Sequence, residues 1–158
     1  MELRSLIPND REKILRLLQD VKVFSRQEIK VALEVVDDAL CWPEKKDYLT
    51  FCAFNGSRDL AGYICFGPIP MTDSCYDLYW IAVDKKFSRK GVGGKLLGFM
   101  EAFLAGKKAR RVYVETSSTE PYEAARSFYE KHGYQLVCSI KDFYREGDHK
   151  MIFMKEVR

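Results

Sequence analysis

The 158-residue chain has no long apolar stretch. A membrane-spanning helix needs about 20 consecutive apolar residues, and no segment approaches that length. The opening segment MELRSLIPND also lacks the extended apolar core of a secretion signal. We therefore expect a cytoplasmic protein without a membrane partner.

Cysteine pairs are absent and histidines are few. The five cysteines form an odd set without a Cys-x-x-Cys pair, which argues against a disulfide framework and a zinc knuckle. We expect reduced thiols in the core. His132 and His149 are the only histidines, and neither lies near the Gly-x-Ser-x-Gly turn of a serine hydrolase. We expect no metal site.

The charge balance argues against a nucleic-acid-binding protein. Lys and Arg number 26 against 23 Asp and Glu, so the net charge is only +3, and we interpret the basic residues as spread out rather than gathered in a block. A nucleic-acid-binding face needs a stronger basic cluster, so a small anionic ligand is the better expectation. Because the chain has no repeat and no linker long enough to divide it, we expect a single domain over residues 1–158.

Apolar residues at helical spacing predict four helices. The first follows PND with Asn9 or Asp10 as its cap, and the second covers residues 25–39 with Ser25 as its cap. The third begins inside a glycine-rich turn, and the fourth covers residues 120–134. The expected buried stripes are Ile14, Leu17, Leu18 and Val21; Ile29, Leu33, Val36 and Leu40; Val92, Leu96, Phe99, Met100, Phe103 and Leu104; and Ala125, Phe128, Tyr129 and His132.

Alternating and continuous apolar runs predict six strands. They cover residues 48–54, 60–67, 76–83, 110–118, 135–140 and 150–157. The first two flank the turn NGSRD, where Asn-Gly is expected to supply the positive φ of a hairpin turn. The strand at 76–83 is of the apolar kind that is buried on both faces. The elements together predict a mixed α/β sheet flanked by about four helices.

The segment WIAVDKKFSRKGVGGKLL joins a strand to a helix through a basic, glycine-rich turn. The first turn of a helix offers unpaired backbone N–H groups to an anion, and glycine lets a phosphate approach the main chain. A P-loop would need another glycine and a Ser or Thr after the lysine, and the dinucleotide fingerprint would need a further glycine early in the chain. Neither motif fits. The room and the countercharge come from Gly91, Gly93, Gly94, Arg89, Lys90 and Lys95.

The turn resembles the pyrophosphate loop [QR]-x-x-G-x-[GA] of the GNAT superfamily of acyl-CoA-dependent N-acetyltransferases, with Ser88 in the Gln/Arg position. VYVETSS is similar to the fifth strand of that family, and AARSFYEKHGY to its A-x-x-[apolar]-Y-x-x-x-G-[FY] helix. The resemblance covers about residues 48–156. It implies a mixed, mostly antiparallel sheet of about six to seven strands, with splayed fourth and fifth strands and about four helices.

The resemblance also implies where acetyl-CoA binds. In this family the pantetheine arm pairs with the open edge of the fourth strand as an added strand would. A backbone N–H of that edge, from Ile81 or Ala82 here, is expected to hold the thioester carbonyl and stabilise its oxyanion. The implied contacts are Ile81, Ala82, Val83, Arg89, Lys90, Gly91, Val92, Gly93 and Gly94.

Two residues are candidates for proton transfer. Tyr129 resembles the tyrosine that protonates the departing CoA thiolate, and its alternative role is core packing beside Phe128. Glu115 matches the end of a strand that carries a catalytic glutamate in part of the family, where it would take a proton from the amine. Its alternative is a surface carboxylate paired with Arg110 or Arg111.

The expected function is transfer of an acetyl group from acetyl-CoA to a primary amine, by direct attack in a ternary complex. A non-catalytic module that binds acyl-CoA as a sensor is the alternative. The acceptor can be a small molecule, a protein N-terminus or a lysine side chain, and a homodimer is left open. Neither nucleic acid nor a metal is expected as a partner.

Overall fold

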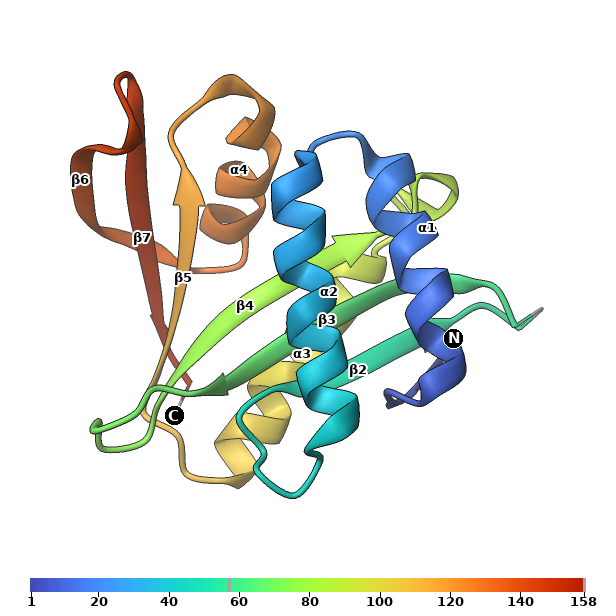
Figure 1. Ribbon diagram of the computed structural model, residues 1–158. Helices are drawn as coiled ribbons and strands as arrows, with labels where there is room; N and C mark the ends of the chain where they lie inside the picture. The colour runs from blue at the N-terminus through green and yellow to red at the C-terminus, as the bar shows by residue number, and fades with distance from the viewer. Residues whose placement is uncertain (57, 158) are drawn as a thin grey trace. The chain divides into compact units, whose positions relative to one another are not determined.

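The computed structural model describes residues 1–56 and 58–157. Seven strands form one mixed, mostly antiparallel sheet in the order β1-β2-β3-β4-β5-β7-β6, accompanied by four α-helices in the described residues (Figure 1). This confirms the predicted fold class. The strands are β1 (Glu2–Ser5), β2 (Leu49–Phe54), β3 (Leu60–Pro68), β4 (Cys75–Val83), β5 (Arg111–Ser117), β6 (Gln135–Arg145) and β7 (Asp148–Glu156). The helices are α1 (Arg11–Val21), α2 (Arg26–Cys41), α3 (Val92–Gly106) and α4 (Glu123–Lys131), with single turns η1 (Pro8–Asp10), η2 (Lys85–Phe87) and η3 (Glu120–Tyr122).

The chain groups into two compact units. The first contains Met1–Gly67 and Tyr79–Glu101, and the second contains Pro68–Leu78 and the chain from Ala102 on. Strand β4 therefore contributes residues to both units. The expectation of a single domain over residues 1–158 stays a prediction.

In the first unit, α1 and α2 cover one face of β2 and β3 (Figure 1). Ser25 caps α2, because its hydroxyl accepts the Glu28 N–H at 3.1 Å while the Glu28 carboxylate accepts the Ser25 N–H at 2.6 Å. Of the predicted stripes on these helices, Ile14, Leu17, Leu18 and Val36 are fully buried, whereas Val21, Ile29, Leu33 and Leu40 are partly buried and pack against the same cluster. The buried stripes were thus predicted correctly in outline.

Helix α3 packs on the other face of the same strands. The ring of Phe99 meets Phe51 of β2 edge to face, with 4.7 Å between the centroids. A side chain at Gly62 of β3 would meet the Ala82 carbonyl oxygen at 2.8 Å and Leu96 at 3.1 Å, so glycine permits this close approach. Leu97 is also fully buried, which the predicted stripe did not include.

Strand β1 was not predicted. It pairs antiparallel with β2, from Glu2 with Phe54 to Ser5 with Phe51. Arg4 of this strand forms two hydrogen bonds with the Asp10 carboxylate at 2.7 and 2.9 Å, and Asp10 is fully buried. Asp10 also accepts the Ile7 N–H at 2.9 Å, so it does not cap α1 with its side chain.

The β2–β3 turn differs from the prediction in its backbone. Arg58 has the positive φ, at 67°, and Gly56 does not. The turn closes through Arg58 N–H to Asn55 O at 2.9 Å and Asn55 N–H to Asp59 O at 3.0 Å. The predicted turn includes Ser57, which lies outside the described residues.

In the second unit, β5, β7 and β6 form an antiparallel ladder beside α4 (Figure 1). Every residue of β6 is exposed, and this strand is longer than predicted. The predicted fully buried strand at 76–83 also differs: β4 buries Cys75, Leu78 and Ala82, and its other side chains are half-buried.

The five cysteines are all free thiols. Cys52, Cys65 and Cys75 are buried, while Cys41 and Cys138 are exposed. The expectation of core thiols therefore holds for three of them. No helix in the described part of the chain combines the length and apolar character needed to cross a membrane.

Candidate active site

The glycine-rich turn begins directly after β4. Asp84 accepts the Lys86 N–H with its side chain at 2.8 Å, and the single turn η2 follows. Arg89 and Gly91 then take positive φ values of 61° and 78°, which turn the chain into α3. A Cβ at Gly91 would have open space around it, so its left-handed backbone, not crowding, is what favours glycine there.

The start of α3 leaves backbone donors available. Its first i to i−4 bond runs from Lys95 N–H to Gly91 O at 3.0 Å, so the N–H groups of Val92, Gly93 and Gly94 precede that bond. Lys90 N–H is directed within the turn, to Phe87 O at 3.3 Å. The side chain of Lys90 is therefore its better means of contacting a phosphate.

Five cationic residues lie in the same segment of the chain as these donors. Lys85, Lys86, Arg89, Lys90 and Lys95 are exposed, and none forms an ion pair with another residue in the described part of the chain. Asp84 is the only acidic residue between positions 84 and 95. Unpaired helix donors and uncompensated cations are what a pyrophosphate requires, so these residues fit the phosphates of acetyl-CoA.

The predicted pantetheine edge lies just before the turn. The parallel β4–β5 ladder joins four residue pairs, from Cys75 with Arg111 to Leu78 with Val114, and β4 continues for five residues past the last pair. Ile81 and Val83 are half-buried, and Ala82 belongs to the core of the first unit. The Asp84 N–H donates to Ala61 O at 2.8 Å, which anchors this end of β4 to β3.

Tyr129 lies on α4 and is 6% exposed. Its ring lies in an aromatic cluster with Phe128 at 5.6 Å, Tyr134 at 6.0 Å and Phe153 at 6.1 Å between centroids. Burial raises the pKa of its phenol, so the hydroxyl keeps its proton through the neutral range. Core packing and proton donation are both compatible with this position.

Glu115 lies on β5 and points away from that cluster. Val114 is paired with Phe153, which contacts Tyr129, and successive side chains of a strand alternate between its faces. Tyr129 and Glu115 are therefore on opposite faces of β5. The Glu115 carboxylate pairs with Lys150 Nζ at 3.0 Å, and its side chain is 49% exposed.

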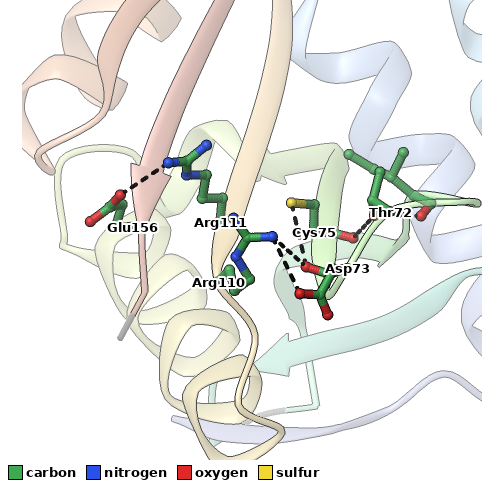
Figure 2. Close-up of polar contacts among 7 residues, drawn as sticks. Thr72, Asp73, Cys75, Arg110, Arg111 and Glu156 are labelled. Atoms are coloured by element: carbon green, nitrogen blue, oxygen red, sulfur yellow. Dashed lines mark hydrogen bonds and ion pairs between the residues drawn. The ribbon is translucent and has the colours of Figure 1, made fainter.

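The predicted alternative partners of Glu115 were wrong. Figure 2 shows Arg110 directed to Asp73, with 3.3 Å to its carbonyl oxygen and 3.5 Å to its carboxylate, and Arg111 directed to Glu156 at 3.4 Å. Lys150 lies 35 positions after Glu115 in the chain, so no local pattern could identify it.

Asp77 is a candidate that the sequence reasoning missed. It is a half-buried carboxylate in β4, four residues before Ile81, and its Cα partner in β5 is Tyr113. Burial, and next the negative charge of Glu115, raise the pKa of Asp77 to about 6, while Lys150 lowers it. A carboxylate with this proton affinity suits acid-base chemistry near neutral pH. Within the described residues, no cluster of three or more His, Cys, Asp or Glu could hold a metal ion.

Comparisons with known proteins identify the family and the fold of the chain. A model of the acetyltransferase (GNAT) family matches residues 12–134. A search of curated proteins gives no significant match. The crystal structure of a protein assigned to the GNAT acetyltransferases from Desulfovibrio desulfuricans shares 35% identity at a TM-score of 0.94, with 99% of each chain covered.

More distant structures share the fold. An aminoglycoside 6'-N-acetyltransferase complexed with coenzyme A has 16% identity and a TM-score of 0.77, over 100% of this chain and 98% of the other. The ribosomal-protein-S18-alanine N-acetyltransferase of Escherichia coli has 19% identity and the same TM-score of 0.77, over 99% and 93%. The family match and the relative at 35% identity establish that the chain belongs to the GNAT family of acetyltransferases.

Proposed function

We propose that the chain is an N-acetyltransferase that transfers an acetyl group from acetyl-CoA to a primary amine by direct attack in a ternary complex. The observation that carries the proposal is the start of α3, where backbone donors precede the first helical bond and five exposed cations lie in the same segment. Arg89, Lys90 and the backbone from Gly91 to Gly94 would hold the phosphates. The edge from Ile81 to Val83 would pair with the pantetheine arm.

Tyr129 and a carboxylate of the second unit would move the protons. The phenol of Tyr129 keeps its proton and is suited to donate it to the sulfur that leaves. Glu115 of β5 and Asp77 of β4 lie on the opposite face of the sheet from Tyr129. Glu115, the base predicted from the sequence, is already paired with Lys150 Nζ at 3.0 Å.

The proposal is tested by thiol release from acetyl-CoA in the presence of a panel of small amines, polyamines, and peptides with free N-termini or lysines. We expect release that requires an amine, together with acetyl-CoA binding in calorimetry. Binding without release for any amine would favour the alternative, a non-catalytic acyl-CoA sensor. The absence of binding would contradict both functions.

The proposal also covers the domain organisation, the location, the partners and the assembly of the protein. We infer a single domain over residues 1–158 that acts in the cytoplasm without nucleic acid, membrane or metal. The acceptor is an amine on a small molecule, a protein N-terminus or a lysine, and a homodimer is left open. Sedimentation of the purified chain measures its assembly directly.

A further inference from the structure

Two buried polar groups of the first unit have no protein partner. The Tyr63 hydroxyl of β3 and the Trp80 indole Nε1–H of β4 are both out of contact with solvent. Neither forms a hydrogen bond with any residue that the structure describes. Most buried polar groups in folded proteins are hydrogen-bonded, and an unpaired one destabilises the fold, so each of these two needs a physical explanation.

The two groups differ in depth. Tyr63 is 1% exposed and belongs to the core between the sheet and helices α1 and α2. Trp80 is half-buried and packs against the outside of that core cluster. Its ring meets Phe24 with 5.6 Å between the centroids, and Phe24 lies in the connection of residues 22–25 between α1 and α2. A ligand can therefore approach the Trp80 indole from outside the core, whereas Tyr63 is enclosed.

Trp80 directly precedes the segment that is predicted to hold the thioester. Ile81 and Ala82 follow it in β4, and a backbone N–H of one of them is the predicted donor to the thioester carbonyl. A carbonyl that accepts a hydrogen bond from a strand edge lies near the plane of the sheet. A nucleophile attacks such a carbonyl from above or below its plane, so the acceptor amine arrives from one face of the sheet.

The two faces of the sheet are not equally open at this point. Val92 and Leu96 of α3 are buried against β3, where a Cβ at Gly62 would lie 2.8 Å from the Ala82 carbonyl oxygen. This packing closes the face on which α3 lies. Trp80 packs with the residues of α1 and α2 on the other face, so the amine and the indole share that face.

We propose that the Trp80 indole N–H binds an oxygen atom of the acceptor close to its amino group. The inference rests on the proposed N-acetyltransferase function and names its acceptor class. An indole N–H can only donate a hydrogen bond, and the amine nitrogen needs its lone pair for the attack, which leaves an oxygen as the partner. The class contains amino alcohols, amino sugars, amino-acid amides and peptide N-termini, and it excludes alkylamines and polyamines.

Binding requires a movement of the α1–α2 connection. Because the Nε1 atom is out of contact with solvent, a ligand reaches it only when a neighbouring side chain moves. Phe24 is the neighbour that a short connection carries, and Lys22 begins this connection with a left-handed φ of 59°. Four residues can shift without unfolding the helices on either side. The new hydrogen bond to the acceptor then offsets the cost of this shift.

The first experiment compares 2-methoxyethylamine with n-butylamine, which differ by an oxygen in place of one methylene group. We expect the wild-type protein to have the higher kcat/KM with the ether amine. Trp80→Phe should reduce this preference about 5–10-fold, because phenylalanine keeps an apolar ring but lacks the donor. The ratio of the two amines within one protein cancels any general loss of activity in the variant.

Two control variants separate the contact from its alternatives. Trp42→Phe makes the same substitution at the other tryptophan, which is 51% exposed after α2. Tyr63→Phe removes the second unpaired group, which lies inside the core. We expect both variants to keep the wild-type preference for the ether amine. If Tyr63→Phe reduced the preference as much as Trp80→Phe, a general effect of the core would replace the proposed contact.

The second experiment observes the indole directly and needs neither turnover nor a variant at position 80. The chain has two tryptophans, so the ¹⁵N-labelled protein gives two indole N–H signals in NMR, and Trp42→Phe assigns that of Trp80. With CoA bound, saturating 2-methoxyethylamine should move the Trp80 signal downfield, because a hydrogen bond to oxygen deshields the proton. We expect n-butylamine to leave this signal in place.

Several results would overturn the inference. One is an unchanged preference in Trp80→Phe, and another is a Trp80 signal that responds equally to both amines. A signal that is already downfield in the free protein and does not move would assign the indole to an internal water. Efficient acetylation of n-butylamine and polyamines by the wild-type protein would remove the acceptor class. If no amine releases thiol, the proposed function itself fails, which differs from thiol release without a preference for oxygen.

Discussion

Tyr129 combines a buried ring with a hydroxyl that keeps its proton. Its contacts with Phe128, Tyr134 and Phe153 are contacts of the ring, and phenylalanine would preserve them. We expect Tyr129→Phe to lower kcat by about 10-fold or more while the acetyl-CoA affinity changes little, because only the proton donor to the sulfur is lost. Steady-state kinetics with calorimetry of acetyl-CoA binding measure both quantities.

Tyr134→Phe is the matched control for this prediction. Tyr134 is a second buried tyrosine of the same aromatic cluster, and its ring centroid lies 6.0 Å from that of Tyr129. We expect kcat to remain at the wild-type value in this variant. Equal rates for the Tyr129→Phe and wild-type proteins would limit Tyr129 to core packing.

At the scale of single elements, the first turn of α3 contains Gly93, which is half-buried. A side chain there would occupy the space where a phosphate approaches the backbone donors. We expect Gly93→Leu to weaken acetyl-CoA binding at least about 10-fold, while circular dichroism shows an intact helix content. Calorimetry gives the affinity.

Gly98→Leu provides the control in the same helix. Gly98 is exposed, and a Cβ at this position would contact nothing within 4 Å. We expect this variant to bind acetyl-CoA as the wild-type protein does. If both variants keep wild-type affinity, the turn before α3 does not bind the pyrophosphate.

The segment from β1 to α1 depends on one buried carboxylate. Burial alone would raise the pKa of Asp10, but hydrogen bonds from Arg4 and the Ile7 N–H outweigh it and lower the pKa. We expect Asp10→Asn to reduce the free energy of unfolding at neutral pH by about 1–3 kcal/mol, since hydrogen bonds to a charged group are lost and Arg4 keeps partial contact with solvent. Urea denaturation measures the change.

The pH dependence of this effect has a definite sign. A folded-state pKa below the unfolded value of about 3.9 stabilises the fold above that value, and the contribution is lost as the pH falls through the folded pKa. The difference between the Asp10→Asn and wild-type proteins should therefore shrink at acidic pH. Glu12→Gln removes an exposed ion pair with Arg16 in the same segment, and we expect little change from it.

These elements also show what local patterns could predict. The four helices, six of the strands and the turn before α3 follow from periodicity, caps and glycine placement, all of which act within a few residues. Strand β1 is only four residues long and is fixed by β2 and by the Arg4–Asp10 pair, which lie outside its own sequence. The positive φ at Arg58 similarly reflects how the whole turn closes.

The candidate base illustrates the same limit. Asp77, Glu115 and Lys150 come from three strands, and their mutual effect on proton affinity exists only once the sheet has formed. Resemblance could propose Glu115 because the end of its strand matches a family pattern. It could not show that Lys150 forms an ion pair with Glu115, or that the negative charge of Glu115 raises the pKa of Asp77.

At the scale of the whole molecule, the expectation that the basic residues are spread out is wrong for one segment, which has a local excess of positive charge. Residues 84–95 contain five of the 26 Lys and Arg residues and one of the 23 Asp and Glu residues. The rest of the chain therefore has 21 basic and 22 acidic side chains. The net charge of +3 is therefore a net +4 in this segment and −1 elsewhere. Attraction of an anionic acyl donor should be a property of the turn and not of the molecule's overall field.

Salt dependence tests this distribution. Exposed charges are screened over about 10 Å at 0.1 M salt and about 3 Å at 1 M, so we expect the Kd for acetyl-CoA to rise several-fold between about 0.05 and 0.5 M NaCl. Lys90→Gln and Lys95→Gln should each raise the Kd at low salt and flatten its dependence on salt. Lys30→Gln changes the net charge equally, but Lys30 is exposed on α2. We expect this variant to leave the Kd for acetyl-CoA and its dependence on salt unchanged. If Lys30→Gln flattened the dependence as much as Lys90→Gln, the attraction would come from net charge, and the segment from 84 to 95 would lose its assignment as the phosphate site.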